Sequence, residues 1–202
     1  MFKKIKNNLM HYFYLQMKYM QSIQDEKEFE SLKKKFRKIG ANFYLGKDYK
    51  FTNAQYIEIG EDFTAGNRLK IDAIDYYGNK NFTPEIIIGK NVTITNDVHI
   101  GAIGKIVVGD GCLLASKVYI SDHSHGNITR ESLEIRPVDR PLTSKGDVII
   151  GKNVWIGEGA SVLPNVIIGD NCIVGTNAVV TKSIPQNCIV AGVPAKVIKN
   201  FN

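Results

Sequence analysis

Two of the four histidines in this chain lie close together, in the segment Ser121-Asp122-His123-Ser124-His125. A neutral imidazole near its ordinary pKa can accept the proton of a hydroxyl group at physiological pH. Transfer of an acyl group from a thioester to an alcohol is a reaction that needs such a base. The residues by themselves leave either histidine as the candidate.

The same segment opens a long polar stretch. Residues 121–148 make up 28 residues of mostly polar and charged chain with two prolines. Stretches of that length in a compact domain are usually functional loops. A shorter irregular stretch, residues 72–84, contains Tyr76 and Tyr77. We therefore expect loops that leave a regular framework at both stretches, the longer of which carries the chemistry.

The framework is visible as a six-residue period. An aliphatic residue recurs at every sixth position: Ile150, Ile156, Val162, Ile168, Val174 and Val180. Four residues after each comes a small or apolar residue: Val154, Ala160, Val166, Cys172, Ala178 and Ile184. A period of six fits neither a helix nor a simple strand alternation. It predicts a solenoid with three short strands per turn, each placing its aliphatic side chain inward.

Before residue 150 the same frame is present but broken. We expect the coil to begin at Tyr56 and each slip in the frame to mark an extruded loop. The slips lie at residues 72–84, 102–107 and 121–148. Cys112 and Cys172 occupy small inward positions, and no C-x-x-C motif is present, so we interpret them as core residues.

The positive charge is concentrated at the N-terminus. The net charge is +6; residues 1–38 hold ten Lys or Arg and four Asp or Glu, and residues 39–202 hold sixteen of each. Apolar residues at helical spacing predict a helical segment over residues 1–40, ended by Gly40 as a C-cap. One packed stripe of this helix is expected to contain Phe2, Ile5, Leu9, Tyr12, Phe13 and Met20. Its lysines form either a solvated face or a surface for acidic lipid or a polyanionic substrate. The lack of aromatic-interleaved basic repeats disfavours nucleic acid as a partner.

Composition also bears on localisation. The sequence has no run of about 18 apolar residues and no signal-type segment, so we expect a cytoplasmic protein. Peripheral contact with the inner face of the membrane through the basic segment is the alternative.

The run GKNVWIGEGASVLPNVIIGDNCIVGTNAVVTKSIPQNCIVAGVPAKVIK resembles the hexapeptide-repeat acyltransferases, in particular the branch of galactoside, maltose and capsular-polysaccharide O-acetyltransferases. The resemblance covers residues 55–200 and implies a left-handed parallel β-helix, a homotrimer and acetyl-CoA as donor. We therefore predict an all-β solenoid: a left-handed parallel β-helix over residues 41–202, with an N-terminal helical segment (1–40) and an extruded active-site loop (121–148).

The resemblance also distinguishes between the histidines. In this branch the base is the histidine just after the strand that leads into the extruded loop, within an Asp-His pair. That assigns catalysis to His123 and Asp122. Acceptor binding is expected at His99, His125, Tyr76 and Arg140. At His99 the galactoside branch has an asparagine instead, and an exposed corner histidine without a role is the alternative.

The donor residues follow from the same resemblance. Trp155 lies between inward Val154 and Ile156 and must point outward, and in similar enzymes it lines the acetyl and pantetheine channel. The rest of the pantetheine arm of CoA is expected to lie along Gly157, Gly159, Ala160, Gly175, Thr176 and Ala178. The phosphates are expected near Thr181, Lys182 and Lys196, where a lysine suffices as a point charge.

We thus predict acetyl transfer from acetyl-CoA to a saccharide hydroxyl, with no metal. The preferred acceptor is a cell-surface polysaccharide or its lipid-linked precursor. Simple galactosides, maltosides and a xenobiotic hydroxyl are the alternatives. A different class, a zinc lyase resembling the γ-type carbonic anhydrases, could use His99, His123 and His125. A structural solenoid is disfavoured because the hexads carry no threonine ladder.

Overall fold

The computed structural model describes residues 2–127 and 129–201, and the chain divides into two compact units. The first unit, Met1–Phe36, contains the helix α1 (Phe2–Lys33). Within α1 the side chains of Phe13 and Met20, predicted to lie on its packed stripe, are 54% and 64% exposed. The predicted partners of that stripe at residues 2, 5, 9 and 12 lie outside the described side chains.

The predicted cap at Gly40 is wrong. The helix ends at Lys33, and the chain then enters the solenoid at Lys38 rather than at Tyr56. Gly40 lies at the first corner of the coil, where an added Cβ would collide with the backbone nitrogen of Glu61 in the next turn. The glycine is therefore required by close coil stacking.

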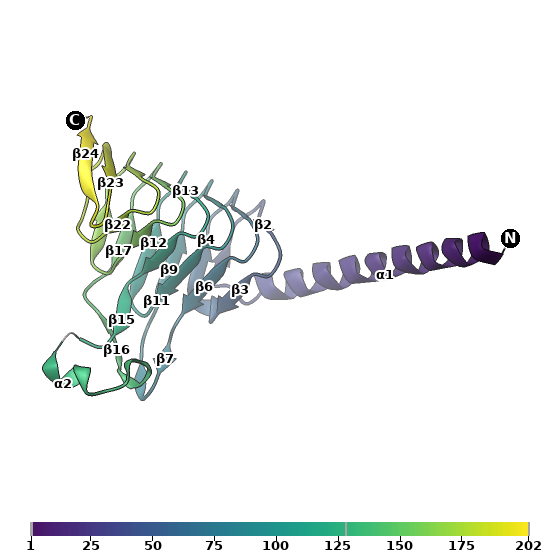
Figure 1. Cartoon of the computed structure of the whole chain (residues 1–202), viewed down its shortest axis with the longest axis horizontal. Coiled ribbons are helices and arrows are strands. Elements are labelled where there is room, and N and C mark those ends of the chain that lie inside the picture. Colours follow the sequence, from purple (N-terminus) through teal and green to yellow (C-terminus); the bar gives the residue numbers. More distant parts are fainter. Residues whose placement is uncertain (1, 128, 202) are drawn as a thin grey trace. The chain divides into compact units, whose positions relative to one another are not determined.

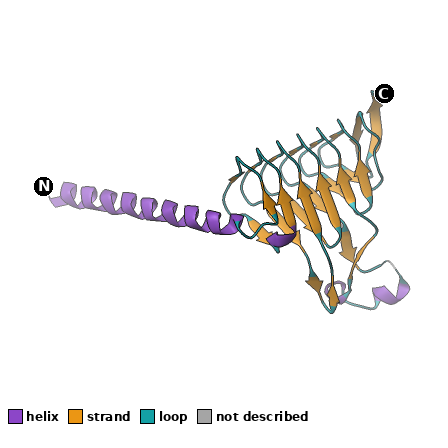
Figure 2. Ribbon diagram, turned by 180° about the vertical axis from the view of Figure 1, so that it is seen from behind, coloured by secondary structure: helices purple, strands orange, loops and turns teal. Residues whose placement is uncertain are grey.

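The second unit, Arg37–Asn202, is the left-handed β-helix, built from three sheets that run along its axis (Figures 1 and 2). Sheet A contains β1 (Lys38–Ile39), β4 (Ile57–Ile59), β9 (Glu85–Ile88), β12 (Lys105–Val108), β17 (Val148–Ile150) and β20 (Val166–Ile168). Sheet B contains β2 (Tyr44–Leu45), β5 (Thr64–Ala65), β10 (Thr93–Ile94), β13 (Leu113–Leu114), β18 (Trp155–Ile156), β21 (Ile173–Val174), β23 (Cys188–Ala191) and β24 (Lys196–Asn200). Sheet C contains β3 (Lys50–Thr52), β6 (Lys70–Ala73), β11 (His99–Ala102), β14 (Tyr119–Ser121), β19 (Ser161–Val162) and β22 (Val179–Val180).

Each coil passes through sheets A, B and C in that order, and neighbouring strands pair in parallel, with β23–β24 as the antiparallel exception. A 3-10 turn, η1 (Ala54–Tyr56), lies between β3 and β4. All twelve predicted inward positions of the hexads are buried. The three cysteines are buried free thiols, which confirms their interpretation as core, and burial raises the pKa of Cys112 to about 11. The core is a stack of aliphatic layers enclosed by the three sheets.

The corners depend on residues that tolerate a left-handed backbone. Among residues 2–127 and 129–201, thirteen residues other than glycine have positive φ, and eleven of these are Asn or Asp. Asparagine and aspartate visit this conformation more readily than other side chains. Along one corner the amides also bond between coils: Asn153 Nδ2 donates to Asn171 Oδ1 (3.3 Å), and Asn171 Nδ2 donates to Asn187 Oδ1 (3.0 Å).

Two loops leave the β-helix at one corner, between sheets C and A. The first carries the hairpin β7 (Tyr76–Tyr77) and β8 (Lys80–Asn81). The second is the predicted long loop; it contains the ribbon β15 (His123–His125) and β16 (Leu142–Ser144), the helix α2 (Arg130–Leu133) and the 3-10 turn η2 (Pro137–Asp139). The predicted third loop, at residues 102–107, is wrong, because β11 and β12 are joined there by a tight turn at Ile103–Gly104.

The outward rows differ from sheet to sheet. On sheet A the register aligns Ile87, Val107, Ile149 and Ile167. On sheet B it aligns Leu113, Trp155, Ile173 and Ile189. On sheet C it aligns Lys50, Lys70, His99 and Tyr119. Sheets A and B therefore each present an apolar row over several coils, whereas the row on sheet C is largely polar.

The asparagine corner can be tested with Asn171. We expect Asn171→Ala to lower the free energy of unfolding by about 1 to 3 kcal/mol, because alanine disfavours positive φ and removes two amide bonds. Asn171→Gly is the matched control. It removes the same two amide bonds, but glycine adopts positive φ readily, so it should lower the free energy of unfolding by less than alanine does. Urea denaturation measures both, and an equal loss in the two variants would contradict the backbone argument.

Candidate active site

His123 is held by an aspartate in a fixed orientation. Its Nδ1 lies 3.0 Å from Oδ1 of Asp122 and 3.2 Å from Oγ of Ser121. Because an ionised carboxylate can only accept, Nδ1 carries the proton. Nε2 then has its lone pair available, and it has no hydrogen-bond partner among the described residues. This is the tautomer that a general base needs.

Asp122 is itself fixed by the tight turn between β11 and β12. Its side chain is fully buried, Oδ1 accepts from the amide of Ile103 (2.9 Å), and Oδ2 accepts from the amide of Gly104 (2.7 Å). A side chain at position 104 would crowd the carboxylate of Asp122, since a Cβ added to Gly104 would lie 3.2 Å from Oδ2. The slip in the frame at residues 102–107 therefore supplies the two donors that balance a buried charge.

His99 and His123 lie next to each other over Gly101. An added Cβ at Gly101 would be 3.3 Å from Cε1 of His123 and 3.7 Å from Nε2 of His99. The parallel pairing of β11 with β14 explains this, because it places Gly101 beside Ser121, two residues before His123. Gly101 is buried, and its lack of a side chain lets the two imidazoles lie next to each other, since a Cβ there would crowd the ring of His123.

His99 is oriented by Asp72, a residue that sequence reasoning missed. Nε2 of His99 lies 3.0 Å from Oδ2 of Asp72, which also pairs with Nζ of Lys70 (2.9 Å), while Oδ1 accepts from Thr52 (2.7 Å). Burial opposes ionisation of this carboxyl, but the hydrogen bonds from His99, Thr52 and Lys70 together outweigh it and hold the pKa of Asp72 well below its usual range. Tyr119 packs edge-on against His99 at 5.5 Å between ring centroids.

The other acceptor candidates lie in the extruded loops. Tyr76 is 60% exposed, whereas the neighbouring Tyr77 places its hydroxyl 3.4 Å from Nδ1 of His125. Tyr77 therefore contacts His125, and acceptor binding by Tyr76 stays a prediction. Arg140 lies after η2, with Nε donating to the carbonyl of Ile135 (2.9 Å). In a hairpin adjacent side chains face opposite ways, and the sequence did not show which tyrosine faces the site.

The predicted pantetheine residues gather at a different corner, between sheets B and C. The amide of Gly157 donates to the carbonyl of Val174, and that of Gly175 donates to the carbonyl of Val190, so these turns stack from coil to coil. Gly159 and Thr176 belong to the same two turns. The side chains of Ala160 and Ala178 point into the core, so only the turns that they close could contact the donor.

The predicted phosphate residues lie in the last coil. Thr181 and Lys182 are exposed and follow β22, at the corner between sheets C and A. Lys196 begins β24, next to Ala195, whose amide donates to the carbonyl of Val179 (2.8 Å).

Trp155 points outward from sheet B with 49% exposure, as expected. Within one chain, His123 and the pantetheine turns therefore occupy two different corners.

The three histidines of the zinc alternative do not converge. The described residues contain no group of three His, Cys, Asp or Glu side chains placed to hold a metal ion. Instead each imidazole faces its own partner: Asp72 for His99, Asp122 for His123 and Tyr77 for His125.

Comparison with known proteins identifies the family. A family model described as bacterial transferase hexapeptide (six repeats) matches residues 147–182. WbbJ of Escherichia coli strain K12, assigned as a lipopolysaccharide biosynthesis O-acetyl transferase, is 43% identical over 150 residues, covering 72% of each chain. The chain belongs to the hexapeptide-repeat acyltransferase family, in the sugar O-acetyltransferase branch that the sequence indicates.

More distant relatives agree on the fold. Galactoside O-acetyltransferase of Escherichia coli strain K12 is 31% identical over 88% of this chain and 70% of its own. The crystal structure of a maltose O-acetyltransferase from Clostridium difficile 630 is 26% identical, with a TM-score of 0.59 over 88% of this chain and 76% of that one. AntD, an N-acyltransferase from Bacillus cereus, reaches a TM-score of 0.68 over 87% and 89% of the two chains; at 22% identity it supports the fold alone.

The Asp72 network predicts a pH effect on stability. We expect Asp72→Asn to lower the free energy of unfolding by about 1 to 3 kcal/mol at neutral pH. Because the folded-state pKa of Asp72 lies below its unfolded value of about 3.9, this contribution is fully present above that value and is lost as the pH falls through the folded pKa. Urea titrations should give the same difference in free energy of unfolding between wild type and Asp72→Asn at about pH 7 and pH 5, and a smaller difference at about pH 3. A difference that grows on acidification would contradict the assignment.

Proposed function

We propose that this protein transfers the acetyl group of acetyl-CoA to a hydroxyl of a saccharide, with His123 as general base. The observation that carries the proposal is the His123–Asp122 pair, in which Asp122 holds Nδ1 of His123 and leaves Nε2 without a hydrogen-bond partner among the described residues. The O-acetyltransferase relatives support the same reaction class.

In the proposed reaction Nε2 of His123 takes the proton of the acceptor hydroxyl as its oxygen attacks the thioester carbonyl. Asp122 stabilises the imidazolium that forms, because two backbone amides hold its carboxylate next to Nδ1. The imidazolium then returns the proton to the CoA sulfur. His99, held by Asp72, lies on the other side of Gly101 and orients the acceptor. The turns at Gly157 and Gly175 take the pantetheine arm, and Lys182 and Lys196 take the phosphates.

We propose a homotrimer because the outer faces suit one. A ring of three copies needs two different complementary patches on each chain. The apolar rows on sheets A and B are two such patches, and sheet C is the polar face left to solvent. Burying both rows in every copy removes apolar side chains such as Ile167 (55% exposed) and Trp155 (49% exposed) from water.

The same ring would complete the active site. If sheet A of one copy packs on sheet B of the next, the corner that carries His123 approaches the neighbour's corner that carries the pantetheine turns. Lys182 lies at the His123 corner, two coils further along. The residues that one chain keeps apart would therefore line a single cleft between copies.

As acceptor we propose a cell-surface polysaccharide or its lipid-linked precursor. The most identical relative described above, WbbJ, is assigned to lipopolysaccharide biosynthesis, and the basic N-terminal segment suits an anionic carrier. No helix among the described residues is long and apolar enough to cross a bilayer. We therefore propose a cytoplasmic location, with α1 in peripheral contact with acidic lipid at the inner face of the membrane.

The base assignment is tested by His123→Ala. We expect turnover to fall about 100-fold or more while acetyl-CoA still binds, since only proton transfer is removed. His125→Ala is the control, because it removes the neighbouring imidazole and leaves the proposed base, His123, in place. Thiol release and product mass with saccharide acceptors measure turnover, and calorimetry measures donor binding. Near-normal turnover in His123→Ala together with its loss in His125→Ala would reverse the assignment.

The shared cleft is tested by complementation. His123→Ala damages one corner, and Thr176→Trp, at an exposed turn residue, should block the other. Each variant should be inactive alone. Mixed trimers refolded from equal amounts should regain activity at about a quarter of the sites, where the two intact corners meet. A wild-type protein that sediments as a 22.5 kDa monomer, or mixtures that stay inactive, would refute the trimer proposal.

A further inference from the structure

A second imidazole held by a carboxylate lies next to the proposed base. Nε2 of His99 is 3.0 Å from Oδ2 of Asp72, just as Nδ1 of His123 is 3.0 Å from Oδ1 of Asp122. Nε2 of His99 and Cε1 of His123 would lie 3.7 and 3.3 Å from a Cβ added to Gly101. Because position 101 is a glycine, no Cβ separates the two rings.

Asp72 fixes the tautomer of His99. Its Oδ2 also pairs with Nζ of Lys70 (2.9 Å), and its Oδ1 accepts from Oγ1 of Thr52 (2.7 Å). Burial opposes ionisation of this carboxyl, but the three donors outweigh burial and hold the pKa of Asp72 well below its usual range. An ionised carboxylate only accepts, so Nε2 of His99 carries the proton and Nδ1 carries a lone pair. Since both oxygens of Asp72 are engaged, it acts on a ligand through His99.

The lone pair of His99 lies on the side of the coil that leads to His123. The nitrogens of an imidazole lie on either side of Cε1 and point away from each other. In sheet C, β11 lies between β6, which carries Asp72, and β14, which ends at Ser121. Because Nε2 of His99 faces Asp72, Nδ1 faces away from β6. The side chain of His99 is 36% exposed, and Nδ1 has no hydrogen-bond partner among the described residues.

Two hydrogen-bond acceptors therefore lie side by side. Nε2 of His123 is bonded to Cε1, the atom next to Gly101, and Nδ1 of His99 is two bonds from Nε2, which lies next to the same glycine. Each of these nitrogens can accept one hydrogen bond from a hydroxyl. Neighbouring hydroxyls of a sugar ring are close enough to reach two adjacent acceptors at once. The pair of imidazoles thus suits a diol.

We propose that His99 determines specificity by accepting, through Nδ1, a hydrogen bond from the hydroxyl next to the one that is acetylated. His123 takes the proton of one hydroxyl and His99 holds the other, while Asp72 is the positioning residue of His99. The acceptor is therefore a saccharide with two free neighbouring hydroxyls. This inference rests on the proposed function, because it names the acceptor class for the same site.

The test compares acceptors that differ in one hydroxyl. Methyl galactoside and methyl glucoside are assayed beside their monodeoxyfluoro derivatives, because fluorine replaces a hydroxyl without being able to donate. For the derivative next to the acetylated position, we expect wild type to prefer the parent diol by about three- to ten-fold in kcat/KM, mainly through KM. His99→Phe should lose most of this preference. Fluorine affects the reacting hydroxyl equally in both proteins, so the ratio of the two preferences isolates the contact with His99.

The positioning role of Asp72 has its own pair of variants. Asp72→Asn removes the charge that keeps the proton on Nε2 of His99, so the preference for the diol should fall as it does in His99→Phe. Thr52→Val is the matched control, because it removes one hydrogen bond to the same carboxylate and leaves the contact with His99. It should keep the preference. Circular dichroism checks that each variant is folded, and a loss of folded protein alone leaves the ratio of two acceptors unchanged.

Equal use of the diol and the deoxyfluoro compound by wild type would overturn the inference. Equal losses with both acceptors in His99→Phe would also overturn it, because His99 would then only shape the site. Calorimetric titration of the same compounds into the CoA complex needs no turnover. If no saccharide is acetylated, the proposed function fails. The inference is then decided by whether replacing one hydroxyl with fluorine weakens binding to wild type and not to His99→Phe.

Discussion

The carboxylate of Asp122 has no exposure to solvent, and it accepts hydrogen bonds from two backbone amides and one imidazole. The amides of Ile103 and Gly104 belong to one coil of the β-helix, and the imidazole belongs to the loop that leaves the next coil. A buried charge without such donors would be strongly unfavourable. The tight turn therefore stabilises the carboxylate, and the carboxylate fixes the imidazole. The rigid coil thus sets the orientation of the base at the start of a long loop.

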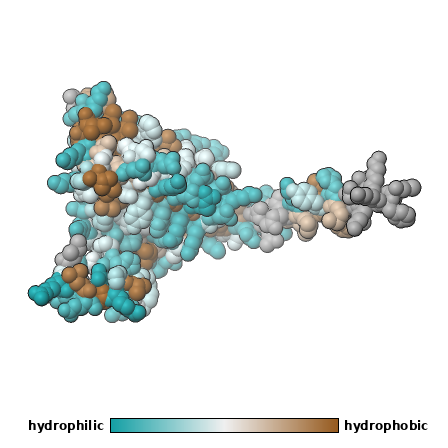
Figure 3. All heavy atoms as spheres, in the orientation of Figure 1, coloured by the Kyte–Doolittle hydropathy of each residue, from teal (hydrophilic) through white to brown (hydrophobic). Residues whose placement is uncertain are grey.

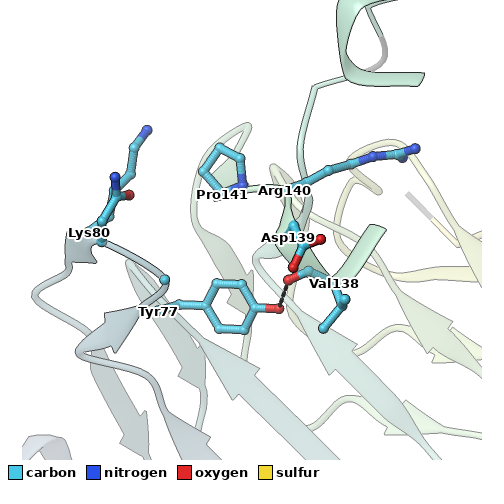
Figure 4. Close-up of a pocket in the computed structure, with 8 residues that line it drawn as sticks. Tyr77, Lys80, Val138, Asp139, Arg140 and Pro141 are labelled. Carbon is cyan, nitrogen blue, oxygen red and sulfur yellow. Dashed lines mark hydrogen bonds between the residues drawn. The ribbon is translucent and has the colours of Figure 1, made fainter. Parts of the chain in front are cut away.

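The solenoid also explains why chemistry concentrates at one corner. Stacked coils place their equivalent residues in line along the axis. Insertions at the same corner of two coils therefore place two loops side by side. The β7–β8 hairpin and the long loop meet through Tyr77, and they enclose a pocket (Figure 4). The space-filling view shows apolar side chains on the long loop and at the C-terminal end of the β-helix (Figure 3). They include Leu133, Val138, Val193 and Ile198, each more than 60% exposed.

Predictions failed where local pattern and tertiary contact diverge. Gly40 resembled a helix cap, but its lack of a side chain is required by the next coil. The slip at residues 102–107 resembled an insertion, yet it is a tight turn that donates two amides. Tyr76 and Tyr77 are equivalent in the sequence, and only the hairpin shows that Tyr77 is the one that contacts His125, while the acceptor role of Tyr76 stays a prediction. In each case the deciding neighbour lies 18 or more residues away in the chain, beyond the reach of periodicity.

The sequence by itself determined the solenoid, its core and the histidine pair, because a six-residue period leaves one arrangement that buries every sixth side chain. It also indicated the family and the donor residues through motifs at the C-terminal end. The tertiary structure alone decided which nitrogen of His123 is available, that Asp72 orients His99, and that Tyr77 meets His125. These properties depend on distances between different coils and loops, and such distances are set by stacking along the axis rather than by the order of residues within a coil.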